Sequence, residues 1–92
     1  MTKDASKILK ISNMRGLHAR ASAKFVDVVE QFDAQATVEK DGLDATGDSI
    51  MGLLMFGAAR GTSISVTTAG PQADALADAL EALVADKFGE EA

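Results

Sequence analysis

The sequence predicts an α+β protein in which antiparallel strands are covered by helices on one face. Short segments that alternate between apolar and polar residues are interspersed with segments whose apolar residues recur every three or four positions. An Asp-Gly pair at 41–42 separates two of the alternating segments, and this pair is typical of the tight turn of a β-hairpin. The expected element order is β-α-β-β-α-β-α, and residues 1–92 are expected to form one domain.

The first half of the chain is expected to contain a strand, a helix and a hairpin. Residues 6–12 are rich in Ile and Leu, which indicates a strand, and residues 13–17 form a loop around Asn and Gly. From Ala19 to Phe32 the apolar residues recur with helical spacing, while charged residues occupy the opposite side. Residues 34–40 and 43–46 alternate, which predicts the two strands of the hairpin.

A short helix and a further strand are expected next. Asp48 or Ser49 supplies the side-chain oxygen that caps a helix N-terminus, and residues 50–56 follow as a short apolar helix. Residues 62–68 alternate again, which predicts the last strand. The polar residues of the alternating segments indicate a sheet with one face exposed to solvent.

The remaining residues predict a third helix. Its apolar positions recur with helical spacing, and Gly70-Pro71 is expected to start it, because proline suits the first helical position. Gly89 is expected to end this helix, since glycine commonly terminates helices. Residues 90–92 are then expected to be a frayed acidic tail.

Composition excludes several classes of function. The chain has no cysteine and one histidine, so disulfide scaffolds, thiol catalysis and multi-histidine or cysteine-ligated metal sites are excluded. Its net charge of −5 disfavours nucleic acid and anionic membranes as partners. Without a long apolar segment, neither a signal peptide nor a membrane span is expected. We therefore expect a small, acidic, cytoplasmic protein, a monomer that needs no metal or cofactor.

The first candidate site is the segment Gly16-Leu17-His18-Ala19-Arg20, where a loop enters a helix. The free N–H groups and the positive dipole end of a helix start attract anions and disfavour a protonated imidazole, so His18 is expected to be neutral and nucleophilic. Arg20 adds a cation whose guanidinium matches phosphate oxygens. These groups can accept a phosphoryl group from a protein donor. A capping or surface histidine without chemistry is the alternative that these residues leave open.

Charge near this helix entry differs in sign from the net charge. Lys10, Arg15, Arg20 and Lys24 lie around it in the sequence, whereas eight of the acidic residues lie from Asp44 onward. A locally basic site is expected, as an anionic group requires.

The second candidate site is the segment from Ser49 to Phe56, Ser-Ile-Met-Gly-Leu-Leu-Met-Phe. Six of the seven residues after Ser49 are large and apolar, and a short helix buries only one stripe of them. Some are expected to stay exposed as a docking surface, where methionines adapt to more than one partner. The alternative is that the fold buries them all. Ser49 is either a helix cap or a site of modification.

With both motifs at this separation, the sequence resembles the HPr family, the histidine-containing phosphocarriers of the phosphoenolpyruvate-dependent phosphotransferase system. The resemblance covers nearly the whole chain. It implies an open-faced β-sandwich with strand order 1-4-2-3 and three helices on one face of the sheet. It also implies that His18 accepts the phosphoryl group on Nδ1 from phospho-enzyme I and passes it to an enzyme IIA of a sugar or nitrogen-related system.

The same resemblance assigns roles to other residues. Arg20 would pair with the phosphate, and Ser49 would be the site for the HPr kinase/phosphorylase. The expected docking face consists of Ala23, Ile50, Met51, Leu54 and Met55. Ala21 and Ser22 follow Arg20 where many family members have proline and a small residue, which leaves the rigidity of the active-site turn open. Ser22 is a further candidate donor to the phosphate.

Two other functions remain open. A regulatory module of the same family would bind partners without carrying phosphate. An acyl carrier is suggested by Asp48-Ser49-Ile50, which resembles a phosphopantetheine attachment motif, with Ser49 as the modified residue. Acyl carriers are all-helical, however, whereas four segments of this chain predict strands.

Overall fold

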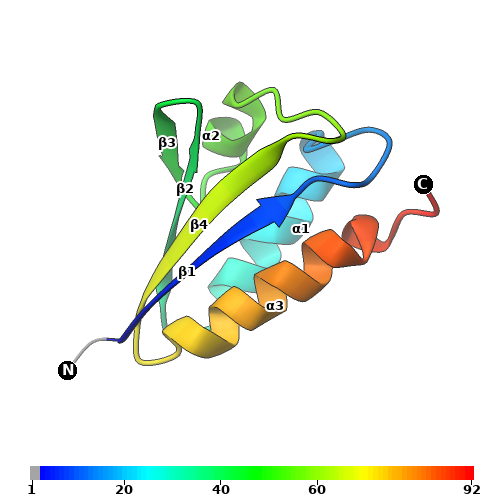
Figure 1. Cartoon of the computed structure of the whole chain (residues 1–92). Coiled ribbons are helices and arrows are strands. Elements are labelled where there is room, and N and C mark those ends of the chain that lie inside the picture. The colour runs from blue at the N-terminus through cyan, green and yellow to red at the C-terminus, as the bar shows by residue number, and fades with distance from the viewer. Residues whose placement is uncertain (1–2) are drawn as a thin grey trace.

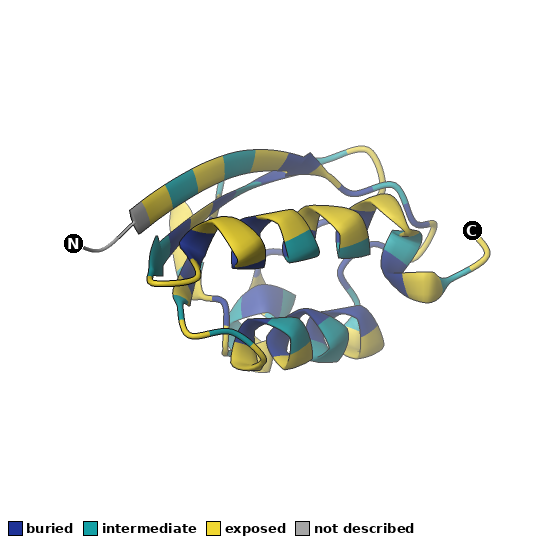
Figure 2. Ribbon diagram, turned by 90° about the horizontal axis from the view of Figure 1, so that it is seen from below, coloured by how far each residue is buried: buried dark blue, intermediate teal, exposed yellow. Residues whose placement is uncertain are grey.

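Four antiparallel strands form one sheet in the computed structural model, which describes residues 3–92 (Figure 1). The strands are β1 (Lys3–Lys10), β2 (Gln35–Lys40), β3 (Leu43–Thr46) and β4 (Ser63–Gly70). The helices are α1 (Ala19–Glu30), α2 (Ile50–Met55) and α3 (Ala73–Ala85), followed by the 3₁₀ turn η1 (Lys87–Gly89). The strand order is β1-β4-β2-β3, and the helices cover one face, which confirms the predicted fold class and topology (Figure 2).

The core lies between the sheet and the helical layer. Alternate residues of β2 and β4 point toward the helices and are buried, whereas their neighbours on the other face, such as Thr37 and Glu39, are exposed. The largest fully buried apolar side chains come from every layer, and they are Ile11, Phe25, Val38, Leu53, Ile64, Val66, Leu76, Leu80 and Phe88. Burial of each such side chain contributes about 1.5–3 kcal/mol to the free energy of unfolding. This core holds the loop before α1 against the end of the sheet.

One turn and one helix cap follow the local chemistry that the sequence predicts. Asp41 and Gly42 have φ values of 53° and 83°, and positive φ at both central positions is what a type I′ turn requires. The hairpin of β2 and β3 is thereby confirmed. At α2, Ser49 is the cap, because its Oγ accepts a hydrogen bond from the N–H of Gly52 at 3.0 Å.

The last helix differs from the prediction at both ends. It begins at Ala73, so Pro71 lies in the preceding turn and is not its first residue. It ends at Ala85, four residues before Gly89. Lys87 and Phe88 both have a φ of 56°, which turns the chain off the helical path. The reason is tertiary, since Phe88 turns inward and is fully buried in the core.

The C-terminal segment runs back along α1 after this turn. Lys24 of α1 donates a hydrogen bond from Nζ to the carbonyl oxygen of Phe88 at 2.6 Å. The expectation of a frayed acidic tail is wrong for Glu90, because its carboxylate contacts two side chains of the N-terminal loop. Within residues 3–92, no helix is long and apolar enough to cross a lipid bilayer.

Candidate functional site

The loop that leads into α1 is organised around Gly16. Gly16 has a φ of 67°, and a Cβ added to it would lie 2.3 Å from the carbonyl oxygen of Ala58. That same oxygen accepts a hydrogen bond from the N–H of Leu17 at 2.9 Å. Asn13 Nδ2 donates to the carbonyl oxygen of Gly16 at 2.8 Å. These contacts fix the backbone immediately before His18, and glycine is required there because the space is taken by backbone.

His18 occupies the N-cap position of α1, as the sequence predicts. Its carbonyl oxygen accepts the first helical hydrogen bond, from the N–H of Ser22 at 2.8 Å. Its side chain makes no capping hydrogen bond, and 22% of that side chain is exposed. The alternative in which His18 serves as a helix cap is therefore not supported, and the imidazole is accessible at the helix start.

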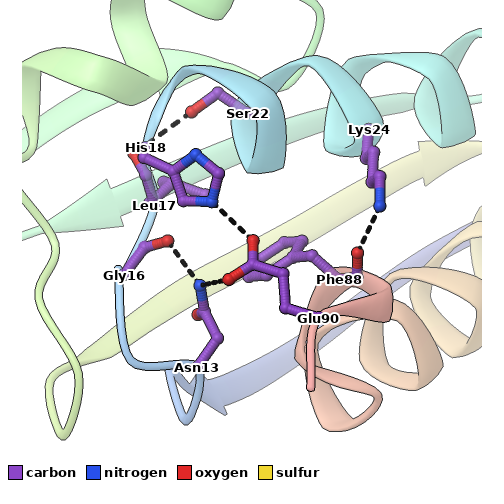
Figure 3. Close-up of polar contacts among 8 residues, drawn as sticks. All are labelled: Asn13, Gly16, Leu17, His18, Ser22, Lys24, Phe88 and Glu90. Atoms are coloured by element: carbon purple, nitrogen blue, oxygen red, sulfur yellow. Dashed lines mark hydrogen bonds and ion pairs between the residues drawn. The ribbon is translucent and has the colours of Figure 1, made fainter. Parts of the chain in front are cut away.

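The imidazole of His18 is held by the C-terminal segment (Figure 3). Nε2 of the ring lies 2.5 Å from Oε2 of Glu90. The other carboxylate oxygen of Glu90 accepts a hydrogen bond from Asn13 Nδ2 at 3.1 Å. Glu90 is 72 residues from His18 and 77 from Asn13, so no local sequence pattern points to this group. Reasoning from the sequence missed both Asn13 and Glu90 as members of the site.

The environment of Glu90 favours its ionised form. The hydrogen bond from the His18 ring lowers the pKa of this carboxyl group below its ordinary value of 4.5. Burial acts in the opposite direction, while the hydrogen bond from Asn13 and the positive charge of Arg15 lower the pKa further. The carboxyl group therefore stays ionised to lower pH in the folded protein than in the unfolded chain.

This shift predicts a pH-dependent contribution of Glu90 to stability. A carboxyl group with a lowered pKa stabilises the folded state fully above its unfolded value, and this contribution is lost as pH falls through the folded pKa. Urea unfolding should show that Glu90→Gln is less stable than the wild type at pH 7. The difference should shrink steadily as the buffer is taken from pH 5 to pH 2.5. A difference that is constant across this range would contradict the ionic origin of the contact.

Arg20 and Ser22 differ in how they relate to the imidazole. Arg20 is exposed in the first turn of α1, and its guanidinium makes no hydrogen bond or ion pair with the side chains or backbone of residues 3–92. Ser22 is fully buried, and its Oγ donates to the carbonyl oxygen of Leu17 at 3.3 Å. The structure thus does not support Ser22 as a phosphate donor group. Ala21, which follows Arg20, is buried and continues the helix.

The basic residues near the helix entry also differ in whether their side chains are exposed or bound to other residues. Arg15 is exposed and close enough to Glu90 to lower its pKa, and Arg20 is exposed nearby on α1. Lys24 is engaged by the carbonyl of Phe88. The site therefore combines two exposed arginines with a histidine whose negative neighbour is Glu90.

Several of the apolar side chains of α2 are exposed. Met51 and Met55 are 71% and 77% exposed, and Ile50 is 39% exposed, whereas Leu53 is fully buried. This confirms that the fold does not bury the whole segment. Met14, in the loop that leads to His18, is also exposed and was not predicted. The other expected docking residues, Ala23 on α1 and Leu54 on α2, are half-buried, and α1 packs against α2.

Comparison with known proteins places these features in a family. Residues 5–86 match the model described as the PTS HPr component phosphorylation site. The chain is 41% identical to the phosphocarrier protein HPr of Cupriavidus necator, over 87% of this chain and 90% of that protein. It is 40% identical to the phosphocarrier protein NPr of Shewanella violacea, over 98% of each chain.

Solved structures agree with this match. The crystal structure of HPr-C-His from Thermoanaerobacter tengcongensis superposes with a TM-score of 0.90 at 35% identity, covering 96% of this chain and 99% of that one. The four-stranded sheet also rules out the all-helical acyl-carrier alternative. Because the family model spans most of the chain and the fold is that of HPr structures, this chain belongs to the HPr family of phosphocarrier proteins of the phosphotransferase system.

Proposed function

We propose that this protein carries a phosphoryl group on Nδ1 of His18, receives it from phospho-enzyme I and passes it to an enzyme IIA. The observation that carries the proposal is the accessible imidazole at the start of α1, bound through Nε2 and not through Nδ1 to Glu90. Nδ1 is thereby available on the side of the ring away from the carboxylate (Figure 3).

The start of α1 supplies the groups that a transferred phosphoryl needs. Because the first helical bond comes from the N–H of Ser22, the N–H groups of Ala19, Arg20 and Ala21 have no intrahelical acceptor. These donors and the positive end of the helix dipole stabilise a phosphoryl group on the preceding histidine. Phosphoryl transfer depends mainly on positioning and electrostatics, so such a site needs little else. The exposed guanidinium of Arg20, two residues after His18, is proposed to pair with the phosphoryl oxygens.

Partner docking is assigned to the apolar face beside the site. This docking face consists of Ala23, Ile50, Met51, Leu54 and Met55. It joins exposed methionines on α2 to the side of α1, and exposed apolar side chains on a small protein commonly mark an interface. Enzyme I and the enzyme IIA are proposed to use the same face in turn, because both must reach the same imidazole.

Ser49 is proposed as the regulatory residue, modified by an HPr kinase/phosphorylase. Its Oγ caps α2 directly beside Ile50, at the edge of the docking face. A phosphate there keeps oxygen acceptors at the start of α2 but brings negative charge next to an apolar surface. Weaker docking of enzyme I is the expected consequence.

A two-stage transfer assay tests the carrier function. Incubation with labelled phosphoenolpyruvate and enzyme I should produce an acid-labile, base-stable label, which identifies a phosphorus–nitrogen bond. Adding an enzyme IIA of the sugar system or of the nitrogen-related system should move the label onto one of them within minutes. Label that forms but moves to neither acceptor would contradict a carrier role and favour a regulatory module.

A further inference from the structure

We infer that Glu90, held by Asn13, is a positioning residue that fixes the tautomer of His18 in which Nδ1 is the nucleophilic nitrogen. The consequence for phosphorylation rests on the proposed function, whereas the tautomer itself does not. The inference starts from the bridge that joins Asn13 to Glu90 and Glu90 to His18 across the two ends of the chain.

The orientation of Asn13 is determined by its neighbours. Its side chain is fully buried, and its Nδ2 donates to the carbonyl oxygen of Gly16 and to Oε1 of Glu90. Oδ1 has no hydrogen-bond partner within the part of the chain that the structure describes. Turning the amide by 180° would place Oδ1 against the carbonyl oxygen of Gly16 and Oε1 of Glu90, which are both acceptors. That repulsion is more unfavourable than an Oδ1 without a hydrogen bond. Asn13 therefore presents an N–H to Glu90 and fixes one of its oxygens.

The carboxylate of Glu90 then determines where the ring proton lies. An ionised carboxylate has acceptors and no donor, so the short contact at Nε2 requires Nε2 to carry the hydrogen. A neutral imidazole has a single N–H, which leaves the lone pair on Nδ1. A carboxylate that orients a reactive histidine through its other nitrogen is a known way to fix both tautomer and ring direction.

The position of Glu90 is fixed by contacts that the residues just before it make with the core and with α1. Phe88 is fully buried, and its carbonyl oxygen accepts from Lys24 Nζ at 2.6 Å. The N–H of Glu90 donates to the carbonyl oxygen of Lys87 at 3.0 Å. Phe88 thus anchors the chain in the core two residues before Glu90. The contact between the Glu90 carboxylate and His18 is therefore preorganised.

This arrangement serves the transfer step directly. The Nδ1 lone pair forms the new bond to phosphorus while the bond between phosphorus and the donor breaks, and its electron pair stays with the donor. Nε2 keeps its proton throughout, and the positive charge that develops on the ring lies against the Glu90 carboxylate. The carboxylate is on the far side of the ring from Nδ1, where it does not oppose the incoming phosphoryl group (Figure 3).

Nitrogen-15 NMR of the imidazole tests the inference, because His18 is the sole histidine and its two ring nitrogens give unambiguous signals. At a pH where the ring is neutral, the wild type should show almost only the Nε2–H tautomer. Glu90→Ala should raise the Nδ1–H population at least threefold and slow the initial rate of phosphorylation by enzyme I about tenfold. Glu90→Gln should give intermediate values, because its amide oxygen still accepts a weaker hydrogen bond. Glu91→Ala, which alters an exposed neighbour, should match the wild type.

The outcomes separate this inference from the proposed function. An unchanged tautomer ratio in Glu90→Ala, with circular dichroism showing the fold intact, would overturn the inference even if phosphorylation were slower. A tautomer ratio that changes in Glu90→Ala, together with a wild-type protein that enzyme I does not phosphorylate, would leave the positioning role in place and overturn the carrier function.

Discussion

Replacing His18 with alanine is expected to abolish labelling by enzyme I and phosphoenolpyruvate. The chain has no second histidine and no cysteine, so no other nucleophile of comparable kind is present. Removal of a nucleophile that forms a covalent intermediate typically costs more than about a thousandfold in rate. The measurement is the initial rate of acid-labile label incorporation, compared with the wild type at equal enzyme I.

The fold should survive this substitution. The His18 side chain does not cap α1, and it is partly exposed. Circular dichroism of His18→Ala should therefore remain close to that of the wild type, whereas urea unfolding should show a small loss of stability because the contact with Glu90 is removed. Arg20→Ala provides a matched variant two residues away, and it should slow labelling without abolishing it. Acid-labile label at the wild-type rate in His18→Ala would refute His18 as the phosphoryl acceptor.

Replacing Phe88 with alanine is expected to have the largest effect on stability of the substitutions considered. The side chain is fully buried, and Phe-to-Ala changes in cores typically cost about 3–5 kcal/mol. Because domains of this kind unfold with about 5–15 kcal/mol, the loss is a large fraction of the total. The midpoint of thermal unfolding should fall by more than about 10 °C, since each kcal/mol corresponds to about 4–8 °C in a domain of up to 100 residues.

A second phenylalanine provides the control. Phe32 lies just after α1 and is only half-buried against the core, so Phe32→Ala should cost clearly less. Phe88→Leu should restore most of the stability, because leucine refills most of the space. Equal losses in Phe88→Ala and Phe32→Ala, measured by urea unfolding, would contradict the inward turn of the C-terminal segment.

Local chemistry explains why much of the fold was predictable. The Asp41-Gly42 turn follows from the positive φ values that these residues tolerate, and the cap at Ser49 follows from the need of free N–H groups for an acceptor. The helical period of α1 predicts which face is buried, and Phe25 and Val29 on that face are indeed buried. Each of these features depends on residues within a few positions of one another.

The misjudged features have non-local causes. The end of α3 was predicted from Gly89, but the chain leaves the helix after Ala85 so that Phe88 can enter a core built by other elements. The hydroxyl of Ser22 was considered for phosphate, but helix and loop packing direct it to the carbonyl of Leu17. The sequence near these residues carries no information about the partners that decide their conformation.

The sequence by itself determined the α+β class, the candidate histidine and its position at a helix start, because these follow from local periodicity and backbone chemistry. The tertiary structure alone decided what surrounds that histidine. Asn13 and Glu90 meet at His18 because Phe88 is buried in the core, and this burial directs the last residues back along α1. Such contacts link opposite ends of the chain, and their free energy depends on the packing of the whole molecule rather than on any one segment.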